Sequence, residues 1–105
     1  MNRVILTGRI CQIRPINKGT AFNIAVYDAG AENNTAFIEC VCFKNCSDFF
    51  QKHFSVGRAI ELEGKISNTR YEKDGQTRYV TNVIAENIGF VKSDKREPEI
   101  EKVAI

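Results

Sequence analysis

Alternation of apolar and polar residues organises the first half of the chain. Much of 3–13, 20–28 and 35–43 is apolar at every second position, which is the period of a β-strand with one face turned inward. Residues typical of turns separate these segments at 14–19 and 29–34. The pattern therefore predicts three successive strands joined by two short connections.

The hydrophobic period changes after the third predicted strand. Apolar residues then recur at steps of three and four, at Cys46, Phe49, Phe50 and Phe54. This spacing predicts a short helix over 46–53, capped at its start by Asn45 or Ser47. We interpret the phenylalanines of this segment as core residues.

Alternation with a period of two returns at 58–67 and again at 78–91. Lys73-Asp74-Gly75-Gln76 lies between them, and its Asp-Gly pair is typical of a hairpin turn. A bend or bulge is expected at Gly8, where glycine interrupts the strand, and a bulge at Val83-Ile84, where the alternation is broken. The order of elements predicts an all-β fold, a five-stranded OB-fold Greek-key barrel with one short helix between strands 3 and 4. That fold typically binds oligonucleotides or oligosaccharides.

The third predicted strand has two unlike faces. Phe37, Glu39, Val41 and Phe43 share one face, and Ala36, Ile38, Cys40 and Cys42 share the other. Glutamate is rarely fully buried, whereas the small apolar face suits a core. We therefore expect Phe37 and Phe43 to point outward, although phenylalanine on a strand is more often a core residue.

Two Arg-Tyr pairs, Arg70-Tyr71 and Arg78-Tyr79, flank the predicted hairpin turn. Single-stranded nucleic acid offers phosphates and unstacked base faces, so a general binder needs cations beside flat rings. Tyr71 is predicted to stack on a base, and Tyr79 either stacks on a base or packs against Tyr71 across the hairpin. The alternative is a hairpin whose charges are simply solvated.

Composition narrows the remaining possibilities. A chain of 105 residues suits one domain. Its formal charge of +2 is too small to indicate an anionic partner by itself. No apolar run is long enough to span a membrane, and no signal peptide is expected, so a cytoplasmic, nucleoid-associated location is predicted. Cys11, Cys40, Cys42 and Cys46 match no zinc pattern and are interpreted as buried structural thiols. We expect no enzyme activity, no catalytic residue, no metal site and no cofactor.

Four segments of the chain resemble bacterial and phage single-stranded-DNA-binding proteins. They are NRVILTGRI (2–10), FNIAVYD (22–28), TAFIECVCFKNCSDFFQKHFSVGRAIELEGKI (35–66) and TRYEKDGQTRYVTNVIAENIGFV (69–91). The resemblance implies an OB-fold, a homo-oligomer, most simply a tetramer, and sequence-tolerant binding of single-stranded DNA during replication, recombination and repair. It also implies stacking on Phe37, Phe43 and Tyr71.

The predicted organisation is an OB-fold single-stranded-DNA-binding domain at 1–91 and a short flexible tail at 92–105. The tail carries no Asp cluster and no terminal Phe, so recruitment of partner proteins through an acidic tail peptide is not expected. The candidate stacking residues are Phe37, Phe43, Tyr71 and Tyr79. The candidate phosphate contacts are Arg3, Arg9, Lys44, Arg58, Lys65, Arg70, Lys73 and Arg78.

Two other functions fit the same sequence. The first is a primosome-type OB adaptor, often dimeric, that links single-stranded DNA to a helicase. The second is an OB-fold module for RNA or protein interaction, on which the basic hairpin is incidental. A subunit count separates the first from a tetrameric coating protein, and relative affinity for DNA and RNA strands separates the second.

Overall fold

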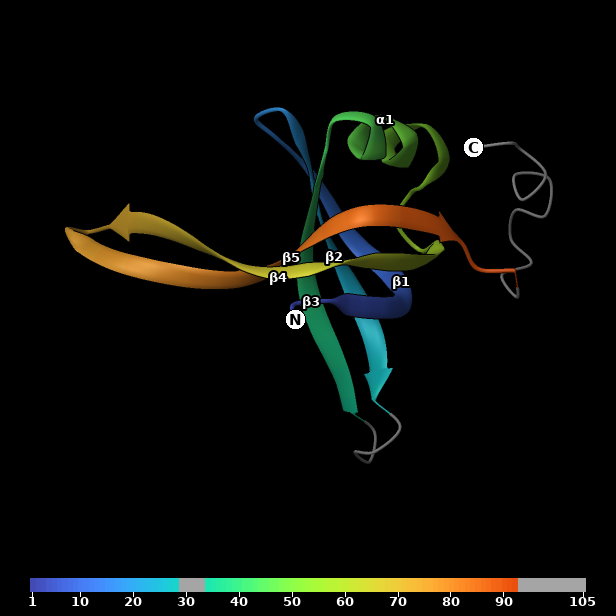
Figure 1. Ribbon diagram of the computed structural model, residues 1–105, viewed down its shortest axis with the longest axis horizontal. Coiled ribbons are helices and arrows are strands. Elements are labelled where there is room, and N and C mark those ends of the chain that lie inside the picture. Colours follow the sequence, from blue (N-terminus) through green and yellow to red (C-terminus); the bar gives the residue numbers. More distant parts are fainter. Residues whose placement is uncertain (29–33, 93–105) are drawn as a thin grey trace.

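A computed structural model describes residues 1–28 and 34–92 of the chain (Figure 1). Its elements in order are β1 (Val4–Ile16), β2 (Gly19–Asp28), β3 (Asn34–Phe43), α1 (Lys44–His53), β4 (Ala59–Lys73) and β5 (Gln76–Phe90). The predicted order of three strands, one helix and two strands is confirmed. The connection predicted at 29–34 and the tail at 92–105 lie almost wholly outside the described residues.

The five strands form a closed barrel in the order β1-β2-β3-β5-β4. Neighbouring strands are antiparallel except β3 and β5, which close the barrel through a short parallel contact at Cys40–Val83 and Val41–Ile84. Closure pairs most of the strand edges around the barrel, which is how an OB-fold limits exposed edges. The predicted OB-fold barrel with its helix after the third strand is confirmed.

The hairpin of β4 and β5 is longer than the sequence pattern suggested. Both strands contain 15 residues and remain paired as far as Lys73 and Gln76. Asp74 and Gly75 form the turn with φ angles of 55° and 76°, the left-handed values that a two-residue hairpin turn requires. The paired ends of these strands extend away from the barrel as an arm (Figure 1). The predicted turn is therefore confirmed, and the strands on either side of it were underestimated.

No register shift occurs at Gly8 or at Val83-Ile84, so a bulge at either position is wrong. Register shifts occur between Ile10 and Gln12 of β1, and on β4 between Glu63 and Gly64, where β5 contributes the extra residue Glu86. Gly8 instead marks a close approach of strands, because a Cβ there would lie 2.7 Å from the carbonyl oxygen of Ala25. Glycine is needed at this position because the two backbones approach closely. Glycine within a strand occurs both at bulges and at close approaches, so the sequence alone does not distinguish them.

The helix α1 covers one end of the barrel (Figure 1). It begins at Lys44, two residues before the predicted start, and no side chain caps it. Ser47, a predicted cap, is buried instead, with its hydroxyl 2.7 Å from the Thr20 hydroxyl. Among the residues described here, no helix is long and apolar enough to cross a membrane.

The core lies between α1 and the inner faces of the strands. Phe50 and Phe22 stack with ring centroids 4.4 Å apart, and Phe50 also stacks on Phe54. Phe49 is half-buried at the rim, 5.7 Å from the Phe90 ring. The predicted core roles of Phe50 and Phe54 are confirmed. The buried cluster contains Ile10, Phe22, Ile24, Cys40, Cys42, Phe50, Phe54, Ile60, Leu62, Val83 and Ala85.

Candidate nucleic-acid interface

In the hairpin, the tyrosine of each Arg-Tyr pair lies opposite the arginine of the other pair. Tyr71 lies opposite Arg78, and Arg70 lies opposite Tyr79. Because neighbouring residues on a strand point to opposite faces, one face of the arm carries Tyr71 with Arg78, and the other carries Tyr79 with Arg70. Each face therefore holds one ring and one cation from different strands, and the alternative of a Tyr71–Tyr79 cross-strand pair is wrong.

A groove of about 500 Å³ runs between the base of this arm and the outer face of β3. Both Phe43 and Tyr71 line it, although they are 28 positions apart in sequence. Its full lining is Arg14, Ile16, Ala21, Glu39, Val41, Phe43, Thr69, Tyr71, Val80, Asn82 and Ile84. The groove thus gathers residues of all five strands around two aromatic rings.

The predicted outward orientation of the aromatic residues is confirmed. Phe37 is 70% exposed, Phe43 39% and Tyr71 40%. Phe37 and Phe43 share the outer face of β3, about 20 Å apart for six residues at the strand rise. Gly19 pairs with Phe43 across β2 and β3, and a Cβ there would lie 2.7 Å from the Phe43 ring. The absence of a side chain at Gly19 therefore leaves room for that ring.

Several of the predicted cations lie near these rings. Lys44 follows Phe43 directly, with a left-handed φ of 54° at the start of α1. Lys65 pairs with the groove residue Ile84, and Lys73 lies two positions beyond Tyr71 on the same face of β4. Together with Arg78, they form a set of cations along the groove and the arm. Their contact with phosphate stays a prediction, as does base stacking on the rings.

Four predicted phosphate contacts lie away from the groove. Arg70 lies on the opposite face of the arm from Tyr71, and the other three lie on the barrel, where one of them is corrected. Arg3 forms an ion pair with Glu63, and Arg9 donates from Nη1 to the Gly57 carbonyl oxygen at 2.8 Å. Arg58 is only 3% exposed. Its guanidinium lies 5.4 Å and 5.1 Å from the ring centroids of Phe54 and Phe90 and donates to the His53 carbonyl oxygen at 2.7 Å. Arg58 supports the barrel end, because a side chain so covered cannot reach a phosphate.

Two residues of the outer face were missed by the sequence reasoning. Arg14 was assigned to a turn, whereas β1 continues to Ile16 and places its side chain in the groove. Tyr27 is exposed on β2, opposite Thr35 and diagonal to Phe37 on the same face. Continuing the alternation through Gln12, Arg14 and Ile16 would have found the first. The pairing of β2 with β3 was needed to find the second.

The cysteines show no sign of a catalytic or metal site. Burial raises the pKa of Cys40 to about 12, and Glu39 adds to that shift. A hydrogen bond with Cys46, with burial, raises the pKa of Cys42, and the same bond lowers the pKa of Cys46. Cys11 is exposed, so its interpretation as a buried thiol is wrong. Within 1–28 and 34–92, no three His, Cys, Asp or Glu side chains are grouped to hold a metal ion.

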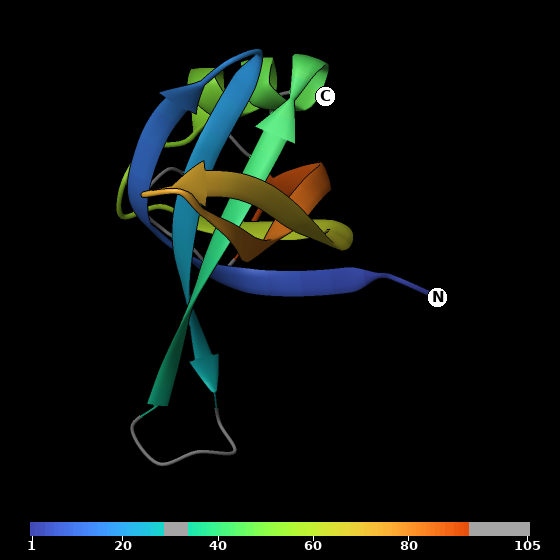
Figure 2. The ribbon, with the colours of Figure 1, turned by 90° about the vertical axis from the view of Figure 1, so that its left-hand side faces the viewer.

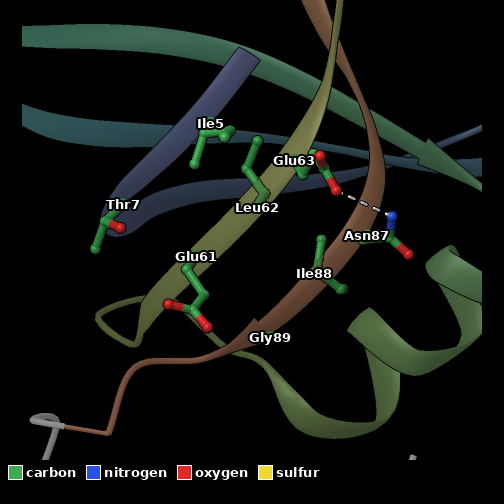
Figure 3. Close-up of a pocket in the computed structure, with 8 residues that line it drawn as sticks. All are labelled: Ile5, Thr7, Glu61, Leu62, Glu63, Asn87, Ile88 and Gly89. Atoms are coloured by element: carbon green, nitrogen blue, oxygen red, sulfur yellow. Dashed lines mark hydrogen bonds between the residues drawn. The ribbon is translucent and has the colours of Figure 1, made fainter. Parts of the chain in front are cut away.

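A separate hollow of about 430 Å³ lies on another part of the barrel surface (Figure 3). It is lined by β1, β4 and β5 and shares no residue with the groove. Ile5 and Ile88 provide apolar surface, while Glu61 and Glu63 place carboxylates beside it, and Asn87 bonds to Glu63. Carboxylates repel phosphate, so this hollow is electrostatically unsuited to a DNA backbone.

An OB-fold barrel that carries exposed aromatic rings beside cations on its outer surface is typical of nucleic-acid-binding proteins. The chain belongs to the single-strand binding protein family, whose model matches residues 1–91.

Similar bacterial proteins are named single-stranded DNA-binding proteins. The chain is 31% identical over 101 residues to the single-stranded DNA-binding protein of Clostridium perfringens, covering 89% of this chain and 67% of that protein. It is 33% identical over 103 residues to that of Staphylococcus aureus strain N315, covering 88% and 66%. The chain thus spans about two thirds of the length of these relatives.

Solved structures share the fold. A crystal structure of the mitochondrial single-stranded DNA binding protein Rim1 of S. cerevisiae matches with a TM-score of 0.67 at 15% identity, covering 84% of this chain and 92% of that one. The Plasmodium falciparum SSB complex with ssDNA matches with a TM-score of 0.69 at 18% identity, covering 87% and 95%. Both support the OB-fold assignment.

Proposed function

We propose that this protein binds single-stranded DNA by stacking bases on Phe37, Phe43 and Tyr71 while nearby cations contact the phosphates. The observation that carries the proposal is that these three rings, which the resemblance implies are stacking residues, are exposed on the outer surface of the barrel. Two of them share one groove. Stacking accepts every base, because every base has a flat face, so this mode of binding does not depend on a sequence.

The cellular role follows from this chemistry and from the family. The protein coats and protects strands exposed in replication, recombination and repair, in the cytoplasm and associated with the nucleoid. It acts as a binding protein without catalytic activity or cofactor. The binding domain comprises 1–91, which is also the extent of the family match.

We further propose that the protein acts as a homo-oligomer, most simply a tetramer. β1 pairs with β4 from Val4 to Arg9 but with β2 only from Arg9 onward. In the described part of the chain, one edge of Val4–Gly8 thus faces no partner strand, and this segment runs out beside the barrel (Figure 2). Such an edge, beside exposed Ile5, favours pairing with a second copy. Light scattering on the intact chain measures the number of subunits.

Fluorescence anisotropy with labelled strands of equal length tests the binding proposal. Single-stranded dT is expected to bind at least about tenfold more tightly than duplex DNA, because duplex bases already stack on one another and leave no free faces for the rings. Equal affinity for single-stranded DNA, duplex and RNA, or no binding at all, would contradict the proposal. Tighter binding to RNA would favour the RNA-interaction alternative.

Replacing Lys73 by glutamine is expected to flatten the salt dependence of binding. Each phosphate neutralised on a single strand contributes about 0.7 to the slope of log affinity against log salt, so the slope should fall by about that amount. The measurement is a series of anisotropy titrations at increasing salt. Lys52→Gln, which removes an exposed cation from the last turn of α1, is the matched control. An identical slope in Lys73→Gln and wild type would place Lys73 off the DNA path.

A further inference from the structure

The floor of the groove contains a carboxylate, which is unexpected on a surface that faces a polyanion. Glu39 lies between Phe37 and Phe43 on the outer face of β3, and its side chain is 25% exposed. Arg14 Nη2 donates to Glu39 Oε2 at 2.5 Å across the groove floor. This ion pair offsets the repulsion of phosphates and holds the carboxylate in place.

Glu39 still has capacity to accept hydrogen bonds. A carboxylate offers about four acceptor sites on two oxygens, and Arg14 is the one donor to it within the described residues. The bond from Arg14 goes to Oε2, and among the described residues no side chain donates to the second oxygen, Oε1. A ligand lying in the groove would therefore meet a negatively charged acceptor between the two stacking rings.

Two amide side chains lie near Glu39, but their oxygen atoms are covered. Asn82 lines the same groove and donates from Nδ2 to Thr69 Oγ1 at 3.3 Å, while its Oδ1 has no hydrogen-bond partner. Asn23, directly opposite Glu39 on β2, likewise has an unpartnered Oδ1. Both amide oxygens are covered by neighbouring atoms, so Glu39 is the acceptor that a ligand reaches first.

The bases differ in what they present to such an acceptor. Cytosine and adenine carry an exocyclic amino group, and guanine carries adjacent ring and amino donors, whereas thymine flanks its single N–H with two carbonyl oxygens. Pairing of a carboxylate with the cytosine amino group is a known direct contact. A thymine edge turned toward Glu39 would bring carbonyl oxygens against the carboxylate.

We propose that Glu39, oriented by Arg14, accepts a hydrogen bond from a base edge and makes the protein prefer strands of amino-bearing bases, such as cytosine, over thymine. This inference rests on the proposed binding of single-stranded DNA and adds a base preference to the sequence-tolerant stacking. The expected preference for dC over dT is roughly 5- to 10-fold, the lower range for one direct base contact.

Anisotropy titrations with dC and dT strands of equal length, at one salt concentration and pH 8, test the preference. Glu39→Gln should bring the dC-to-dT affinity ratio close to one, because an amide can donate to thymine oxygens as well as accept from cytosine. Glu63→Gln is the matched control, since Glu63 is also paired with an arginine but lies outside the groove. That variant should keep the wild-type ratio.

A second measurement needs no variant of the protein. Strands in which 2-pyrimidinone replaces cytosine lack the exocyclic amino group and should bind wild type no better than dT. Equal wild-type affinity for dC and dT would overturn the inference while leaving the proposed function intact, since both strands still bind. A ratio that survives in Glu39→Gln would also overturn it. Failure to bind either strand would instead refute the proposed function, and the inference with it.

Discussion

Replacing Tyr71 by alanine is expected to weaken binding to single-stranded DNA by roughly 10- to 100-fold, because one stacked base is worth about 1–3 kcal/mol. The melting temperature should change little. Tyr71 lies on the groove side of the arm, outside the buried core cluster, so its removal leaves no core cavity. A surface substitution of this kind costs about 0.5 kcal/mol or less, which is about 2–4 °C in a domain of this size.

The arm provides its own control for this experiment. Tyr79 is a second exposed tyrosine on the same hairpin, but it lies on the opposite face from Tyr71. If the strand of DNA follows the groove, Tyr79→Ala should reduce affinity by less than about threefold, well below the loss of one stacked base. Equal losses in the two variants would mean that DNA wraps both faces of the arm. Unfolding of Tyr71→Ala, measured by circular dichroism, would show that Tyr71 is a structural residue.

Local patterns were sufficient to predict the elements of the fold. Alternation and the Asp-Gly turn identified every strand, and the shift of period located α1. The opposite characters of the two faces of β3 correctly predicted that Phe37 and Phe43 point outward. These features depend on residues close together in sequence, where the period alone fixes which side chains share a face.

Features that depend on pairing between distant strands were not predictable in this way. The partnership of Arg14 with Glu39 needs both the extension of β1 to Ile16 and the register of β1, β2 and β3. The burial of Arg58 depends on Phe54 and Phe90, which come together only when the barrel closes. The faces of Tyr71 and Tyr79 likewise follow from the crossed register of β4 and β5.

Gly64 is a position where close contact between β4 and β5 leaves no room for a side chain. It lies at the register shift between β4 and β5, opposite Ala85. A Cβ at Gly64 would collide with the carbonyl oxygen of Ile84 and lie 2.8 Å from its carbonyl carbon and 3.1 Å from Ala85 Cα. All three are backbone atoms, so no side chain can rotate to relieve the clash. Ile84 itself lines the groove, and the strands that cross here continue into the arm that carries Tyr71.

Gly64→Ala is therefore expected to lower the free energy of unfolding by about 3–5 kcal/mol, because clashes in the backbone or the core are among the few changes that destabilise a protein this much. That is a large share of the total stability of a small domain, and it corresponds to a fall in melting temperature of at least about 12 °C. Thermal melts followed by circular dichroism measure it. Gly89→Ala is the matched control, because a Cβ there meets only the flexible Glu61 side chain at 3.4 Å and should change stability by less than about 1 kcal/mol. A Gly64→Ala protein as stable as the Gly89→Ala control would mean that β4 and β5 can separate at this point without loss. The position of Tyr71 at the groove would then not depend on close contact between the two backbones at Gly64.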